Sequence, residues 1–471
     1  MSVVIQERPE IHQLLPPAPE QSLAGWISAM SRALDMAEGL PAGHCRRACW
    51  IAMHIADRMA LDAAQRADLY YTVLLKDIGC TSNAARLFEI YSADDLQLKA
   101  DFHSVDSQNW VQLLRYVAGH VTPHAPVRQR LARLIWIARR GKALQRELII
   151  DRCERGAALA GRMGLSASVA DAIMSLDEHF NGRGNPNHLA AAQIPILSRI
   201  ALAAQIAEVF YSSAGPAQAT RQVCNRSGTT LDPGVVRAFL SVSADGEFWK
   251  TLERPDLPMM LEDIFPPGRD QMMDTAQLTS ALEVLADVLD AKSPALKGHS
   301  RRVGRIAQAM AEHMNLSSVM TRNTYHAALL HDIGKLAISN AILDKPQSWN
   351  TSDILIYRRH VALSVDIISG LPMLAPLVPM VAMHHERLDG TGFPNHLTAD
   401  MIPLGARMIA VADAYDHLCR NNPQMPPSRI MSMLKQDAGL DQNAVAALGD
   451  AAVEAANTHS AACDEPSGRQ M

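Results

Sequence analysis

Aromatic residues, cysteines and long apolar runs are all scarce in this chain of 471 residues, and each scarcity excludes a class of protein. Phe, Trp and Tyr together make up 5% of the residues, which disfavours sandwiches and barrels built from aromatic-rich strands. The seven cysteines are odd in number and scattered, so the sequence indicates neither a disulfide framework nor a zinc knuckle. No run reaches the roughly 18 apolar residues that a membrane-spanning helix needs.

Charge of one sign is also lacking. The 44 Lys and Arg nearly balance the 49 Asp and Glu, so the chain resembles neither an acidic solvating tail nor a basic nucleic-acid arm. Glu7 and Arg8 stand where a secretory signal would need apolar residues. We therefore expect a cytoplasmic protein that binds neither DNA nor a membrane.

Helical periodicity is the dominant pattern that the sequence does contain. Leu278, Leu282, Leu285 and Leu289 recur at the spacing of one helix face, and similar stripes occur in both halves of the chain. Period-two alternation between turn residues is rare. The fold class predicted is all-α, and the length exceeds the roughly 250–300 residues at which a single core stops growing.

The two halves of the chain repeat each other. In the second half, His299 precedes a His-Asp-Ile-Gly-Lys sequence that begins at His331. In the first half, His44 precedes a Lys-Asp-Ile-Gly-Cys sequence that begins at Lys76, at the same interval. A tandem duplication explains this match, because two related copies keep the same order and spacing.

A second match supports the duplication. Residues 386–394 are similar to residues 178–186, and each stretch is followed by Ile-Pro and then by an arginine. The boundary between the copies falls in the Pro- and Gly-bearing stretch 255–268. The predicted divisions are a flexible leader at 1–24, a first copy at 25–265, a second copy at 266–460 and a flexible tail at 461–471.

The second copy gathers an unusual set of metal-capable residues, including the adjacent pairs His331-Asp332 and His384-His385. Imidazole and carboxylate donors without thiolate suit Fe, Mn, Ni or Zn. Neighbouring residues on a helix diverge by about 100°, so an adjacent pair can serve two ions with a carboxylate between them. Two ions roughly 3.5–4 Å apart can clamp a phosphate and activate a water. The complete set is His299, His331, Asp332, His360, His384, His385 and Asp413.

This set resembles the metal-dependent HD phosphohydrolase superfamily, and within it the HD-GYP family of bacterial cyclic di-GMP phosphodiesterases. The resemblance implies two tandem helical HD-type domains, with the seven residues as ligands of two divalent ions, Fe or Mn before Zn or Ni. It also implies that Asp332 bridges the ions, that Lys335 holds the scissile phosphate and that Arg407 contacts the substrate. The resemblance covers about residues 275–425 and rests on the stretches 298–300, 331–335, 342–346, 384–394 and 406–413.

The second copy departs from the family pattern at three places. Phe393 replaces the signature tyrosine, and residues 422–425 read Asn-Pro-Gln-Met where the family has an Arg-Pro-Tyr-Arg stretch that serves the second phosphate. Arg420 or Arg429 could supply the missing charge. Ala295 stands where some relatives carry a carboxylate for a third ion. We therefore expect two ions for each chain and a single cleavage that leaves the linear product pGpG.

The first copy retains only two of the seven donors, His44 and Asp77. Lys76 places a cation where a ligand stands in the second copy, and Cys80 replaces the lysine. We expect no metal there, and the copy then serves as a scaffold, a dimer surface or a ligand sensor. A different site built around His44, Asp77 and Cys80 is the alternative. The remaining ligand positions hold Arg152, Leu176, Asp177 and Gln205.

Together these observations predict a bacterial signalling phosphodiesterase that hydrolyses cyclic di-GMP, mainly to pGpG, at a dimetal site. Two alternatives stay open, a non-catalytic or weakly active nucleotide-binding regulator and an HD phosphohydrolase for another nucleotide. The loss of the basic residues near Asn422 and Met425 favours the first alternative, and the complete ligand set favours the enzyme. A homodimer, or a protein partner bound through the first copy or the glycine-rich loop, is also left open.

Overall fold

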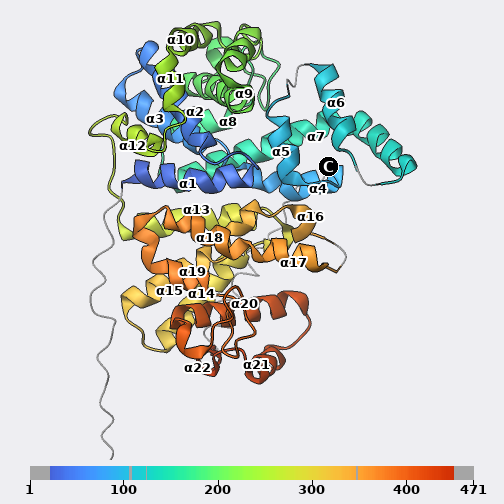
Figure 1. Cartoon of the computed structure of the whole chain (residues 1–471), viewed down its shortest axis with the longest axis vertical. Helices are drawn as coiled ribbons and strands as arrows, with labels where there is room; N and C mark the ends of the chain where they lie inside the picture. Colours follow the sequence, from blue (N-terminus) through green and yellow to red (C-terminus); the bar gives the residue numbers. More distant parts are fainter. Residues whose placement is uncertain (1–21, 106–108, 123–124, 346–347, 450–471) are drawn as a thin grey trace, which may run out of the picture.

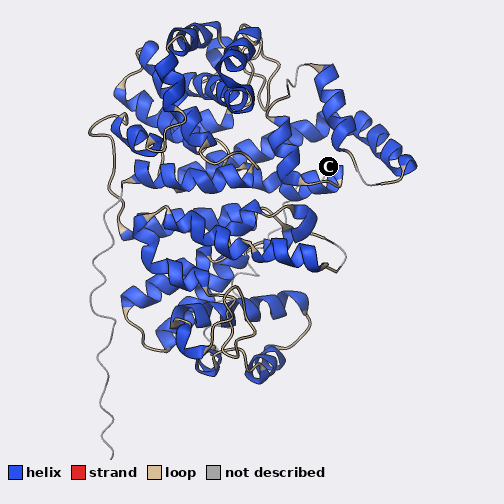
Figure 2. Ribbon diagram, in the orientation of Figure 1, coloured by secondary structure: helices blue, strands red, loops and turns tan. Residues whose placement is uncertain are grey.

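The structure, a computed structural model, describes residues 22–105, 109–122, 125–345 and 348–449. Figure 2 shows helices joined by loops, and no strand occurs among these residues. The all-α expectation is confirmed. Within the described ranges, no helix combines the length and the apolar character needed to cross a bilayer.

The first copy contains twelve of the described α-helices. The short 3-10 helices η1 (Cys80–Asn83) and η2 (Ala191–Gln193) lie between them. The α-helices are α1 (Leu23–Ala37), α2 (His44–Arg58), α3 (Ala63–Leu74), α4 (Ala84–Tyr91), α5 (Asp95–Phe102), α6 (Trp110–His120), α7 (Val127–Arg162), α8 (Ala167–Met174), α9 (Ile196–Asn225), α10 (Pro233–Ser243), α11 (Gly246–Thr251) and α12 (Leu257–Asp263).

The second copy follows with ten α-helices among the described residues, and with 3-10 helices η3 (Pro294–Leu296), η4 (Ile333–Ala337), η5 (Pro372–Leu377) and η6 (Ala399–Met401). The α-helices are α13 (Thr275–Asp290), α14 (His299–His313), α15 (Ser318–Leu330), α16 (Asn340–Leu343), α17 (Thr351–Arg358), α18 (His360–Ser369), α19 (Val378–Ala382), α20 (Leu404–Asn421), α21 (Pro427–Gln436) and α22 (Gln442–Ala447).

The leader ends earlier than the sequence predicts. Ser22 is the N-cap of α1, and its hydroxyl accepts a hydrogen bond from the backbone N–H of Gly25 at 3.1 Å. A serine in this position satisfies one of the free N–H groups of the first turn, so the helix begins at Leu23 rather than after residue 24. The rest of the predicted leader and the predicted tail 461–471 lie outside the described residues.

Equivalent helices of the two copies begin in the same way. Gly43 and Gly298, with φ of 83° and 67°, occupy the left-handed region directly before α2 and α14. Glycine reaches this conformation without strain, so His44 and His299 each become the first residue of a helix. In the second copy, the backbone N–H of Ser300, which follows His299 in α14, donates to the buried carboxylate of Asp290.

A close helix approach is also repeated in both copies. A Cβ atom on Gly334 would lie 2.1 Å from the carbonyl oxygen of His360, and one on Gly79 would lie 2.0 Å from that of Arg152. Only glycine allows the backbone of η4 to lie this near to α18. The hydroxyl of Ser364 on α18 completes the contact, because it accepts from the Gly334 N–H at 2.9 Å.

The two copies are stacked, and α1 and α13 lie along their junction (Figure 1). Helix α1 of the first copy packs against η4 and α18 of the second, while α13 packs against α7 of the first. The buried apolar side chains form one continuous cluster that includes residues of both copies. The first copy therefore contacts the segment that carries Asp332 and Lys335.

We expect Gly334→Ala to destabilise the protein strongly, because the added methyl group would overlap backbone atoms of α18. Overpacking of this kind costs about 3 kcal/mol or more when the obstacle is backbone. Gly161→Ala in α7 is the matched control, since a Cβ there meets no atom within 4 Å. Thermal unfolding followed by circular dichroism should show a clear loss for the first variant only. Equal melting temperatures would contradict the close packing described.

Candidate metal centre

The candidate ligands lie mainly at the ends of helices. His299 and His360 are the first residues of α14 and α18, and His331 directly follows α15. Asp332 is the residue before η4, and His384 and His385 occupy the loop after α19. The adjacent pairs therefore stand beyond or between helices, not within one. Helix ends allow the chain to turn, and both histidines of the second pair face the same carboxylate.

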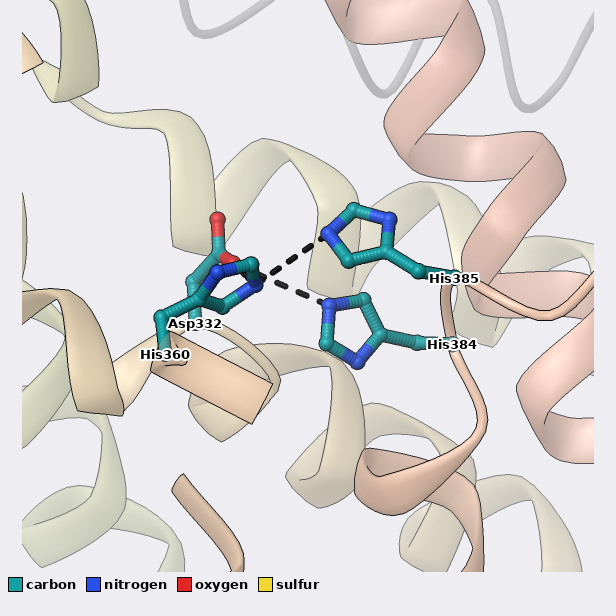
Figure 3. A group of neighbouring side chains, drawn as sticks. All are labelled: Asp332, His360, His384 and His385. Carbon is teal, nitrogen blue, oxygen red and sulfur yellow. Dashed lines mark hydrogen bonds and ion pairs between the residues drawn. The ribbon is translucent and has the colours of Figure 1, made fainter. Parts of the chain in front are cut away.

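The carboxylate of Asp332 is the centre of the group. Its Oδ1 atom lies 3.2 Å from His360 Nε2 and 3.8 Å from His384 Nε2, and His385 Nε2 lies 3.1 Å from His360 Nε2 (Figure 3). Its Oδ2 atom lies 3.2 Å from His331 Nε2 and 3.5 Å from His299 Nε2. The two oxygens thus face two sets of imidazoles, an arrangement suited to a bridging carboxylate.

Asp413 approaches from α20 and completes the set predicted from the sequence. Its Oδ1 atom lies 3.5 Å from His299 Nε2. Its side chain is 26% exposed, whereas that of Asp332 is 1% exposed. Asp413 therefore lies at the accessible side of the group, on the side of His299.

Three of the imidazoles are held in one tautomer by backbone carbonyls. The Nδ1–H groups of His331, His360 and His384 donate to the carbonyl oxygens three residues earlier, at 2.8, 2.6 and 2.7 Å. A ring that donates through Nδ1 directs the lone pair of Nε2 to the opposite side. All three lone pairs therefore point toward Asp332.

Several of these acceptor atoms have no hydrogen-bond partner in the described part of the chain. They are buried, and they comprise His331 Nε2, His384 Nε2 and Asp332 Oδ1. Buried polar atoms without partners are costly, and His360 Nε2 and His385 Nε2 face each other at a distance that requires a proton or a cation. The residues present therefore fit divalent cations, in agreement with two overlapping groups of ligand atoms that share Asp332.

The charge states in the protein alone follow from burial and from these contacts. Burial favours the neutral ring and lowers the pKa of His384 to about 4, and it lowers the pKa of His385 well below its usual value. Burial also opposes protonation of His299, yet its hydrogen bonds with Asp332 and Asp416 raise its pKa to about 9. Two rings thus offer free lone pairs, and the third would release a proton when it bound a metal.

Lys335 reaches the same carboxylate, as its i+3 spacing from Asp332 predicts. Its ammonium group forms an ion pair with Asp332 and lies 5.0 Å from the centre of the Tyr357 ring. Burial disfavours the charged form, but the Asp332 carboxylate holds the pKa of Lys335 above its usual value. The lysine is therefore a buried cation in contact with the candidate ligands.

Phe393, which replaces the family's tyrosine, still packs at the centre. Its ring stacks on His385, with 4.6 Å between the ring centroids, and the guanidinium of Arg358 lies 4.7 Å from the Phe393 ring centre. The aromatic ring thus keeps a packing role without the hydroxyl group.

The sequence analysis did not identify Asp416, which binds His299 through the ring nitrogen Nδ1, on the side away from Asp332. Asp416 Oδ2 lies 2.7 Å from His299 Nδ1, and its carboxylate also pairs with Arg302 and Arg420. The signal was present, because Asp416 follows Asp413 by one helical turn on α20 and therefore lies on a nearby face. In the first copy, Glu208 pairs with His44 and Arg47 in the same arrangement.

Arg407, which the resemblance assigns to the substrate, is held by protein groups in this structure. Its guanidinium donates to the carbonyl oxygens of Ile402 and Ala399 at 2.7 and 2.6 Å, and pairs with Asp441 at 3.2 Å. All three of its nitrogens are therefore committed to holding the loop before α20. Arg407 therefore supports the loop before α20, and its contact with the substrate stays a prediction.

In the first copy, ion pairs replace the cluster of free donors. Lys76 pairs with the buried Asp77, Arg152 pairs with Asp177, and Lys99 lies 3.0 Å from Glu38. Burial opposes the charge on Lys76, but Asp77 holds the pKa of Lys76 above its usual value. The carboxylates there already have protein cations as partners.

A group of Glu38, Asp77 and Cys80 in the first copy is nevertheless close enough to hold an ion. Burial raises the pKa of the Cys80 thiol well above its usual value, so the sulfur is protonated when no metal is bound. Gln205, at the position of Asp413, forms a hydrogen bond with His103 at 3.0 Å. That the first copy holds no metal stays a prediction.

This fold and this donor set define the class of the protein. A family model described as "HD domain" matches residues 132–226 and 283–443, one segment in each copy. The chain belongs to the HD domain family and is an enzyme of its HD-GYP type. HD domain phosphohydrolases bind divalent metals, which agrees with the donor set of the second copy.

Individual relatives are similar over the whole chain or over part of it. The "3′3′-cGAMP-specific phosphodiesterase 3" of Vibrio cholerae is 35% identical over 431 residues, which cover 90% of this chain and 94% of the relative. A "cyclic di-GMP phosphodiesterase" of Thermotoga maritima is 31% identical over 34% of this chain and 44% of its own length. The crystal structure of a cyclic GMP-AMP-specific phosphodiesterase from V. cholerae matches with a TM-score of 0.63 and 31% identity, over 92% of this chain and 98% of that one.

We expect Asp332→Ala to lose most of the bound metal, because the variant lacks the carboxylate shared by both ligand groups. Cys80→Ala is the control in the first copy and should retain the wild-type metal content. The measurement is elemental analysis of the full chain, purified without oxygen and loaded with Fe²⁺ or Mn²⁺, where the wild type should hold two ions. If Asp332→Ala kept its metal, or if Cys80→Ala lost metal, the ions would not be bound at the residues around Asp332.

Proposed function

We propose that this protein hydrolyses a 3′–5′ phosphodiester bond of 3′3′-cyclic GMP-AMP and releases a linear dinucleotide. The observation that carries the proposal is the similarity over both copies to a 3′3′-cGAMP-specific phosphodiesterase, which extends to 94% of that relative. The match to a cyclic di-GMP phosphodiesterase covers only 34% of this chain. Cyclic di-GMP, which the sequence predicts as the substrate, is the second candidate, because relatives of several bacteria act on it.

The seven residues around Asp332 are proposed to hold two divalent ions. Such ions supply positive charge to the phosphoryl oxygens and lower the pKa of water. Asp332 would hold both ions, because its two oxygens face different imidazoles. Asp416 and the three backbone carbonyls keep the ligand rings in place, since each accepts from a ring nitrogen that faces away from Asp332.

Lys335 is proposed to stabilise the phosphoryl group during hydrolysis. A cation next to the reacting phosphate is most effective where water is excluded. Lys335 is only 6% exposed, and its charge is kept in place by Asp332. Its position between the bridging carboxylate and Tyr357 leaves the ammonium group at the edge of the donor cluster.

Contacts of Arg420 support a single cleavage. Arg420 is the nearest candidate to replace the missing cations at 422–425, but its guanidinium pairs with Asp416 and donates to the carbonyl oxygen of Ala295. Arg420 thus places a positive charge next to Ala295, the position at which a third ion would need a carboxylate ligand. A cation there disfavours another cation, so we infer two ions and a linear product that is released without a second cleavage.

Turnover of cyclic dinucleotides by the purified, metal-loaded chain tests the proposed function. We expect 3′3′-cGAMP to be consumed faster than cyclic di-GMP, and the linear dinucleotide to accumulate with slow conversion to mononucleotides. Liquid chromatography of timed samples measures both results. Faster turnover of cyclic di-GMP would support the second candidate. Tight binding of a dinucleotide without turnover would instead show a regulator.

We expect Lys335→Ala to lower kcat by about 10²–10³, the usual scale for loss of one charge-stabilising group, while the metal content stays unchanged. Lys250→Ala is the control, because Lys250 is an exposed lysine that pairs only with nearby Glu247. Steady-state kinetics and elemental analysis of the same samples provide the comparison. Loss of metal in Lys335→Ala would show that the lysine maintains the site instead.

A further inference from the structure

One carboxylate of the first copy is buried inside the second copy. Asp95, the first residue of α5, and Lys292, which follows α13, are both fully buried and lie 3.2 Å apart. The other oxygen of Asp95 accepts from the backbone N–H of Asn340 at 2.6 Å and from the hydroxyl of Ser339 at 3.0 Å. Both oxygens of this carboxylate are therefore occupied by groups of the neighbouring copy.

These partners belong to two segments that adjoin the candidate ligands, the connection before α14 and the connection from η4 into the first turn of α16, which are called the two loops below. Lys292 lies in the connection from α13 to α14, which begins at His299. Ser339 and Asn340 directly follow the segment that contains η4 and Lys335. The side-chain amide of Asn340 donates to the carbonyl oxygen of Lys292 at 2.8 Å, so the two loops also touch each other.

We propose that Asp95 is a positioning residue, supplied by the first copy, that fixes the loop after Lys335 relative to the loop before His299. The proposal rests on the proposed function, because its consequence for activity needs a reaction at the second copy. Asp95 does not contact the donor cluster in the described structure. It acts through Lys292 and Asn340, and small displacements of a reacting group cost large factors in rate.

A second ion pair between the copies differs from the Asp95–Lys292 pair because it is exposed to water. Arg32 of α1 and Asp366 of α18 lie 2.6 Å apart, but their side chains are 40% and 43% exposed. Exposed pairs of this kind contribute little, because water competes for both charges. A buried pair behaves differently, since removal of one partner leaves the other charge without compensation. Asp95→Ala alone would therefore leave the buried Lys292 unpaired and could fail to fold.

The test uses double variants of the full chain, in which no buried charge is left unpaired. Asp95→Ala with Lys292→Met removes the carboxylate and both of its contacts to the loops. Asp95→Asn with Lys292→Met keeps one oxygen that can accept from the Asn340 N–H. Arg32→Gln is the control for loss of an ion pair at the same junction. Melting temperature, metal content, kcat, KM and hydrogen exchange of residues 292–299 and 333–343 are measured for each.

We expect the alanine double variant to fold and bind metal, with kcat lowered at least tenfold, KM within twofold of wild type and faster exchange in both loops. The asparagine double variant should recover most of kcat, and Arg32→Gln should match the wild type. Wild-type kcat and unchanged exchange in the alanine double variant would overturn the proposal. If the wild type turns over no cyclic dinucleotide, the proposed function fails, and the exchange of the two loops still decides whether Asp95 holds them.

Discussion

The enclosed carboxylate of Asp332 is the constraint on which the second copy depends. A buried negative charge needs partners, and the helix ends around it supply imidazoles and one ammonium group. Lys335 is the permanent cation in direct contact, whereas the rings of His384 and His385 are neutral. Asp413 lies near His299, whose pKa is raised to about 9, so this ring carries the second positive charge when no metal is bound. Divalent cations would displace that proton and occupy the lone pairs left without partners.

The first copy solves the same electrostatic problem with protein cations. Asp77 occupies the position equivalent to Asp332. Lys76 occupies the position equivalent to His331, and its ammonium group pairs with Asp77. Arg152 and Lys99 neutralise the remaining carboxylates. The backbone around this cluster has not changed correspondingly, because Gly79 still packs against α7 as Gly334 packs against α18. The two copies thus differ in the side chains around this position, within a fold whose close contacts are the same.

Sequence patterns predicted those features that depend on local spacing. The apolar stripes predicted helices, the repeated motifs predicted two copies, and the donor types predicted which residues gather around Asp332. The patterns do not reveal contacts that join distant segments. Arg407 stands in a motif, and the motif does not show that its partners in the structure are two loop carbonyl groups and Asp441. Asp416 and Asp95 belong to no motif, and their roles depend on helix faces and on packing between the copies.

The stacked arrangement gives a physical reason why the first copy remains attached to the second. Helix α1 packs against η4, the apolar cluster continues across the junction, and Asp95 is buried among loops of the second copy. Without the first copy, η4 would expose an apolar face, and Lys292 would lose the carboxylate that compensates its charge. Both effects act on segments next to Lys335 and His299. The first copy can therefore be retained because the geometry of the second copy depends on it, and no separate activity is needed to explain its presence.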